Sequence, residues 1–133
     1  MAAFIGSNTE ANLRQAFATA TFASRRYIAI AEQADAKGEH REAALFRTIA
    51  KSRAGQAEAH LSRLEPCHDK TSTGYNVRLA IMDEVNACAD AYPAMARTAR
   101  QEGFFEIADW FEVRAKAGRS HTGRFRRVLE TLL

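Results

Sequence analysis

The sequence has little cysteine, proline or glycine, with 2, 2 and 7 of these among its 133 residues. The two cysteines, Cys67 and Cys88, stand in no CxxC pair, which excludes a disulfide scaffold, a rubredoxin-type iron centre and a zinc ribbon. So few prolines and glycines also exclude a collagen-like, low-complexity or linker-rich chain.

Long hydrophobic runs are missing as well. No stretch approaches the ~20 apolar residues of a membrane span, and the first eight residues lack the basic and then apolar layout of a secretory signal. We therefore expect a cytoplasmic protein with no membrane partner. The formal net charge of +3 is too small by itself to indicate a nucleic-acid partner.

The residues that are present, 47% hydrophobic and 26% charged, are typical of one globular domain, which we place over residues 1–133. Alanine is frequent while valine and isoleucine are scarce, so the composition favours helices. We predict an all-α protein of four helices, each about 40 Å long at 1.5 Å per residue. The short connections between them favour an antiparallel four-helix bundle.

The ends of the helices are marked by capping residues. The first helix should begin at Ser7, which has Glu10 three residues later, and end at Lys37, before Gly38. The second should run from Glu39 to Glu65, before Pro66. After a polar loop over residues 67–73, a third helix should bend at Pro93, and a fourth should begin after Gly103.

Helical spacing predicts which residues of each helix point inward. The four predicted stripes, in chain order, are Leu13, Phe17, Ala20, Ser24, Tyr27 and Ala31; Phe46, Ile49, Arg53, Gln56, His60 and Leu64; Val77, Ile81, Glu84, Cys88, Ala91 and Met95; and Ile107, Trp110, Arg114, Ala117, Gly118, His121, Phe125 and Val128.

The two halves of the chain repeat each other at a period of 64 to 65 residues. The repeat predicts a duplicated helical hairpin, so a cofactor between the helices would be held by equivalent positions of both halves. The matching residues are Asn12 and Asn76, Ala31 and Ala96, Gly38 and Gly103, Ala43 and Ala108, Phe46 and Phe111, and Leu64 and Leu129.

A four-helix bundle that holds two irons uses one Glu from each of two helices and a Glu-x-x-His from each of the other two. At the positions that would supply these ligands, the repeat pairs Ala20 with Glu84, Arg53 with Gly118, and Gln56 with His121. The second half therefore keeps one Glu and one His, and the first half keeps no ligand.

Several segments resemble the rubrerythrin branch of the ferritin-like superfamily, over nearly the whole chain. These segments are Thr9-Glu10-Ala11-Asn12-Leu13, Ala57-Glu58-Ala59-His60-Leu61, Ala99-Arg100-Gln101-Glu102-Gly103-Phe104, and Glu106-Ile107-Ala108-Asp109-Trp110-Phe111 with His121 after it. The resemblance implies a ferritin-like bundle, a homodimer, and a di-iron centre that reduces hydrogen peroxide. Relatives usually take the electrons from a rubredoxin module, which we expect to be absent here because the two cysteines cannot form its iron site.

The same resemblance implies a role for individual positions. Glu84 and His121 match two iron ligands, and Tyr27 matches a tyrosine that lies beside the ligands. The positions where the family has Glu, Glu, His, Glu and Glu are here Ala20, Arg53, Gln56, Ala87 and Gly118. Because two irons need several anionic ligands, we expect Glu84 and His121 to be remnants of a metal site that no longer forms.

In place of the irons, we hypothesise a buried ion pair between Arg53 and Glu84, with Gln56, His121 and Tyr27 completing its hydrogen bonds. Pairing avoids the free energy of burying a lone charge. The alternative is that Arg53 extends to solvent at the end of the bundle while Glu84 is solvated or protonated.

These residues leave three functions open. The first is a binding, scaffolding or regulatory protein without cofactor or catalytic residues. The second is a peroxide- or oxygen-handling oxidoreductase with an atypical iron site at Glu84 and His121. The third is a protein that holds a small anion on Arg53 and Arg114. An anionic protein or small molecule is thus a candidate partner.

The remaining polar residues favour structural explanations. A metal site of His60, Cys67 and His68 is less favoured than simple packing of His60, and Cys88 is read as a small core residue. Residues 114–127 hold six Lys or Arg and no acid, which we interpret as a solvated face rather than an anion-binding surface.

Glycines inside the fourth helix need a reason, because each costs about 1 kcal/mol relative to alanine. We predict that Gly118 and Gly123 allow close backbone approach, or leave space for a neighbouring side chain such as Arg53.

Overall fold

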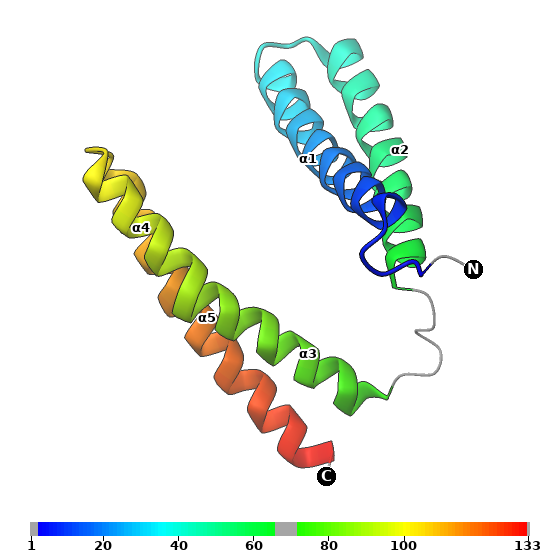
Figure 1. Cartoon of the computed structure of the whole chain (residues 1–133). Coiled ribbons are helices and arrows are strands. Elements are labelled where there is room, and N and C mark those ends of the chain that lie inside the picture. Colours follow the sequence, from blue (N-terminus) through cyan, green and yellow to red (C-terminus); the bar gives the residue numbers. More distant parts are fainter. Residues whose placement is uncertain (1–2, 66–71, 133) are drawn as a thin grey trace. The chain divides into compact units, whose positions relative to one another are not determined.

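A computed structural model describes residues 3–65 and 72–132, and these residues form helices and turns without a strand (Figure 1). None of these helices combines the length and apolarity needed to cross a bilayer. The chain divides into two compact units, Met1–His68 and Asp69–Leu133. The helices are α1 (Asn8–Ala36) and α2 (His40–Leu64) in the first unit, and α3 (Thr73–Val85), the π-helix η2 (Asn86–Ala91), α4 (Tyr92–Gln101) and α5 (Phe105–Leu132) in the second.

Each unit is an antiparallel helical hairpin. Hairpin 1 pairs α1 with α2, and hairpin 2 pairs the run of α3, η2 and α4 with α5 (Figure 1). The all-α class and the duplicated hairpins that the sequence predicts are therefore confirmed.

Capping residues set the ends of α1 as predicted. The hydroxyl of Ser7 accepts the N–H of Glu10 at 3.0 Å, while the carboxylate of Glu10 accepts the N–H of Gly6 at 3.0 Å. At the other end Gly38 has a φ of +80°, and the N–H of Glu39 returns to the carbonyl of Ala34. In hairpin 2, Gly103 turns the chain in the same way with a φ of +87°.

Small residues fill the interior of both hairpins. Among the described residues, the buried apolar side chains are almost all alanines, and no large side chain is fully buried. Pairs of equivalent alanines are Ala31 and Ala96, Ala34 and Ala99, Ala43 and Ala108, and Ala50 and Ala115. Such side chains let two helices pack closely along their whole length. Each hairpin thus keeps its larger apolar side chains on its flanks.

The structural repeat extends to the aromatic contacts. Tyr27 packs on Phe46 with ring centroids 5.8 Å apart, and 65 residues later Tyr92 packs on Phe111 at 6.0 Å. The two halves therefore share side-chain packing as well as helix ends.

An ion pair near each hairpin turn is also repeated, but with its charges reversed. Asp35 accepts a hydrogen bond from Arg47 at 2.6 Å, and at the equivalent positions Arg100 donates to Glu112 at 2.8 Å. His40 also contacts Asp35, at 2.8 Å. Equivalent positions of the two halves therefore hold an ion pair with the signs of its partners exchanged.

The π-helix explains why the period of the repeat changes. Ala20 and Glu84, before η2, are 64 residues apart, whereas Ala31 and Ala96, after it, are 65 apart. The N–H of Tyr92 bonds to the carbonyl of Ala87, five residues back, so the wider turn accommodates one extra residue. Hairpin 1 has ordinary α-helix at the equivalent place.

Two details of the predicted third helix are wrong for this reason. We expected a bend at Pro93, but the irregularity is the π-helix before it, and Pro93 lies in the first turn of α4. We also expected Ala91 and Met95 to point inward. The extra residue rotates the buried stripe, so Ala96 and Ala99 are buried instead and Met95 is exposed.

The predicted stripe of the last helix is only partly buried within hairpin 2. Ile107 and Trp110 are 50% and 51% exposed, while the neighbouring Ala108, Ala115 and Thr122 are buried. The smaller residues make the closest contact with the paired helix because they allow the shortest distance between the helices. Ile107 and Trp110 lie on the flank of the hairpin.

The Asp35 cluster predicts a pH-dependent stability. Hydrogen bonds from Arg47, and to a smaller extent from His40, lower the pKa of Asp35 in the folded protein. The contribution of Asp35 to stability is therefore fully present above the unfolded pKa of about 3.9, and it is lost as the pH falls through the lower folded pKa. We expect Asp35→Asn to reduce stability at pH 7 and to have progressively less effect below about pH 4. Urea unfolding across this range measures the difference.

The control is Glu32→Gln on the same helix, since Glu32 is exposed and makes no ion pair among the described residues. A destabilisation by Asp35→Asn that stays constant down to pH 3 would contradict the assignment.

Candidate functional site

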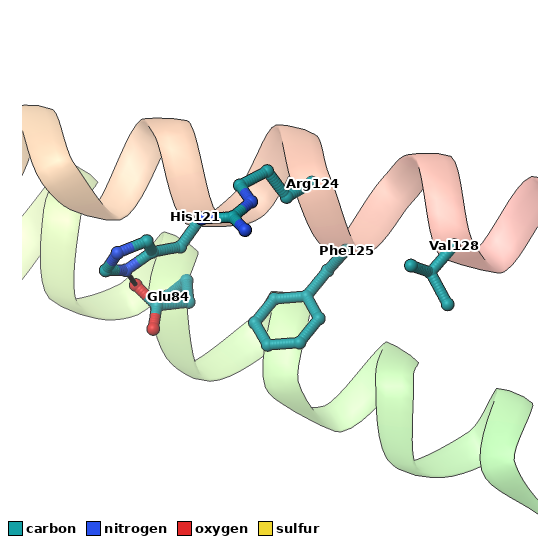
Figure 2. Close-up of a pocket in the computed structure, with 5 residues that line it drawn as sticks. All are labelled: Glu84, His121, Arg124, Phe125 and Val128. Atoms are coloured by element: carbon teal, nitrogen blue, oxygen red, sulfur yellow. Dashed lines mark hydrogen bonds and ion pairs between the residues drawn. The ribbon is translucent and has the colours of Figure 1, made fainter.

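Glu84 and His121 face each other across hairpin 2. Glu84 lies in the last turn of α3 and His121 in the middle of α5, and the imidazole Nδ1 lies 3.3 Å from the carboxylate Oε2 (Figure 2). Their side chains are 30% and 51% exposed, respectively. When Nδ1 carries the proton, it donates to the carboxylate, and protonation of the ring makes the contact an ion pair.

A cavity of about 440 Å³ lies beside this pair. Its lining adds Arg124, Phe125 and Val128 to Glu84 and His121 (Figure 2). One end therefore presents a carboxylate, an imidazole and a guanidinium, while the ring of Phe125 and the side chain of Val128 supply apolar walls. Sequence reasoning missed Arg124, although its spacing of three residues from His121 places the two on one side of the helix.

Gly118 lies where the helices come closest. A Cβ atom at this position would be 2.7 Å from the Cβ of Cys88 and 3.3 Å from Oε2 of Glu84. Real Cβ atoms essentially never come within 3.0 Å of a neighbour, so no side chain fits without a shift of η2 or α5. Close backbone approach, one of the two predicted reasons for this glycine, is confirmed, and the neighbour within hairpin 2 is Cys88.

Cys88 is a buried residue, as predicted, with 4% of its surface exposed. Its thiol lies 3.9 Å from the carbonyl oxygen of Val85. His60 is half-buried on α2, whereas Cys67 and His68 lie outside the described residues.

Hairpin 1 brings together two other predicted site residues. Arg53 and Gln56 lie one turn apart on α2, and the guanidinium donates to the side-chain oxygen of Gln56 at 3.1 Å. Ala20, at the remaining ligand position of this half, is buried. Tyr27 packs its ring on Phe46. The predicted polar network thus has one cluster in each hairpin, Arg53 with Gln56 and Glu84 with His121.

Arg114 has a partner that the sequence analysis did not identify. Its guanidinium lies over the indole of Trp110, 4.3 Å from the ring centroid. The spacing of four residues, which brings side chains together on a helix, was the available signal. Arg114 therefore contacts an aromatic ring on its own helix.

The donors of this site do not fit a di-iron centre. Over residues 3–65 and 72–132, no group of three or more His, Cys, Asp or Glu side chains is arranged to hold a metal ion. Glu84 and His121 supply one carboxylate and one imidazole, whereas two irons need several anionic ligands.

Two helical hairpins related by an internal repeat, with Glu and His left at ligand positions, define a ferritin-like protein. The family model for rubrerythrin matches residues 11–129. Rubrerythrin of Porphyromonas gingivalis is 35% identical over 134 residues, which cover 93% of this chain and 67% of that protein. Rubrerythrin of Clostridium perfringens is 26% identical over 141 residues, 96% of this chain and 72% of that protein.

The chain therefore belongs to the rubrerythrin family, in agreement with the ferritin-like four-helix class that the sequence predicts. It spans about two thirds of the length of these relatives.

Proposed function

We propose that this chain is a rubrerythrin-family protein whose di-iron centre has been replaced by a metal-free polar core, and that it acts by binding, scaffolding or regulation. The observation that carries the proposal is the contact at Gly118. Because Cys88 closes this position, the carboxylate that the family places there cannot be supplied without moving a helix. The change thus concerns helix packing as well as residue identity.

The charges of the two clusters support the same proposal. In hairpin 1 the polar atoms come from a guanidinium and an amide, and in hairpin 2 from a carboxylate and an imidazole. In the four-helix arrangement of the family, Arg53 and Glu84 belong to the same central layer. We propose that they form an ion pair, with Gln56, His121 and Tyr27 around it.

A second candidate function is an oxidoreductase with an atypical iron site. Glu84 and His121 favour it, since both are iron-ligand types, lie within 3.3 Å of each other and border a cavity. Such a site would need further ligands from water or a second subunit. The third candidate function, the binding of a small anion by Arg53 and Arg114, stays a prediction. The homodimer and the cytoplasmic location stay predictions as well.

Metal content distinguishes the first two candidates. Protein produced with iron and manganese in the medium and purified without chelators is expected to contain well under one transition metal per chain, because too few ligands are present. Elemental analysis and the absorption spectrum measure this. Stoichiometric iron that is lost in Glu84→Gln and His121→Ala would contradict the metal-free core and favour the oxidoreductase instead. Glu106→Gln, which changes an exposed carboxylate in the first turn of α5, is the matched control.

A further inference from the structure

A second cavity lies on the other side of α5, away from His121. It measures about 330 Å³ and is formed where η2 and the end of α3 pack on α5. Its lining residues are Val85, Cys88 and Ala89 from one side and Arg119, Thr122, Gly123 and Arg126 from α5. It therefore combines an apolar floor with the side chains of two arginines.

Gly123 is the centre of this surface of α5. Nothing lies within 4 Å of the place where its Cβ would be, so the helix backbone is open to a ligand there. Arg119 precedes it by four residues and Arg126 follows it by three, which places both side chains beside it on one helix face. Lys116 and Arg127 extend the same face.

These four cations have no protein partner in the part of the chain that the structure describes. None of Lys116, Arg119, Arg126 or Arg127 makes an ion pair or hydrogen bond there. Asp109 and Glu112 of α5 both bind Arg100. Glu106 is ten residues before Lys116, and Glu130, four residues after Arg126, makes no ion pair with it among the described residues. Positive charge therefore lies around an open apolar cavity, and this cavity is the reason to favour an anion-binding surface here over the solvated face that the sequence alone suggested.

We propose that this cavity is a binding site for a small organic phosphate. The phosphoryl group lies over Gly123, between the guanidinium groups of Arg119 and Arg126. The Cα atoms of these two arginines are about 10 Å apart along the helix, and their side chains are long enough to reach one phosphate together. Guanidinium groups match phosphate oxygens with paired hydrogen bonds. The apolar part of the ligand packs on Val85 and Ala89.

A phosphate is favoured over a carboxylate because its second negative charge uses the additional cations, Lys116 and Arg127. The site shares no lining residue with the cavity at Glu84 and His121. It is therefore independent of whether the chain binds a metal.

The probe is 1-naphthyl phosphate, titrated into the full chain at low ionic strength by isothermal calorimetry. We expect saturable binding with one site per chain, weakened about tenfold or more by Arg119→Gln and by Arg126→Gln. Arg124→Gln is the matched control, since it removes the same charge from α5 but lines the other cavity. It should change the affinity little.

Gly123→Leu tests the cavity without changing any charge. Its side chain points into open space, so the helix should form normally, as checked by circular dichroism, while binding is lost. Two related probes define the ligand class. Inorganic phosphate, which lacks the apolar part, and 1-naphthoate, which has one charge, should both bind more weakly than 1-naphthyl phosphate.

Three results would overturn the proposal. These are no binding of 1-naphthyl phosphate at about 5 mM, an equal loss of affinity in Arg124→Gln and Arg119→Gln, and unchanged binding in Gly123→Leu. Tighter binding of inorganic phosphate or naphthoate than of naphthyl phosphate would also contradict it.

Discussion

Replacing either Arg53 by Met or Glu84 by Gln should lower the free energy of unfolding by about 3 to 5 kcal/mol, while replacing both should cost much less than the sum. This prediction rests on the proposed ion pair: a charge that is buried there and loses its partner remains desolvated, whereas removing both charges removes the desolvation penalty as well. The double-mutant cycle should therefore show a large favourable coupling.

Equilibrium unfolding of the wild type, both single variants and the double variant in metal-free buffer measures the coupling. The matched control is the cycle of Lys51→Met with Asp83→Asn, exposed residues near Arg53 and Glu84 in the sequence that make no ion pair among the described residues. It should show small, additive effects. If the Arg53 and Glu84 effects are additive within about 0.5 kcal/mol, there is no such ion pair.

Helix boundaries could be predicted from the sequence because they depend on local chemistry. The start of the first helix is marked by Ser7 with Glu10 three residues later, and the two hairpin turns are marked by Gly38 and Gly103. These signals act within a few residues and do not depend on contacts with the rest of the chain. Most alanines of the hairpin interiors, such as Ala43, Ala50 and Ala108, were not in the predicted stripes, although their recurrence in both halves was an available signal. The duplicated hairpin therefore followed from the sequence.

The π-helix was not predicted, although its signal was present. The change of period from 64 to 65 residues requires one inserted residue between positions 84 and 96. An inserted residue can be absorbed in a loop, a bend or a π turn, and spacing alone does not distinguish them. Proline at position 93 made a bend the expected outcome, and the structure has a π turn just before it.

At the candidate site, residue identities could be predicted but most contacts could not. Alignment of the halves placed Arg53, Gln56, Glu84 and His121 at ligand positions without indicating which side chains touch. Arg53 contacts Gln56 because the two lie one turn apart on α2, whereas Glu84 contacts His121 because α3 packs closely on α5. The contact between Gly118 and Cys88 depends on the distance between two helices, which no single-helix pattern contains.

Two glycines of α5 should respond oppositely to the same substitution. Gly118→Ala should destabilise the protein, since overpacking against Cys88 typically costs about 1 to 3 kcal/mol and outweighs the gain in helix propensity. Gly123→Ala should stabilise by up to about 1 kcal/mol, because its Cβ meets nothing and alanine favours the helix. Urea unfolding of both variants measures the difference.

Removal of the neighbour tests the cause. Cys88→Gly deletes the Cβ that a side chain at position 118 would meet, so Gly118→Ala should be much less harmful in that background than in the wild type. Equal effects in the two backgrounds, or a Gly118→Ala variant as stable as Gly123→Ala, would show that the helices can separate. A glutamate at position 118 would then be tolerated as well. The contact between Gly118 and Cys88 would then not explain why this chain lacks the glutamate that the family has at this position.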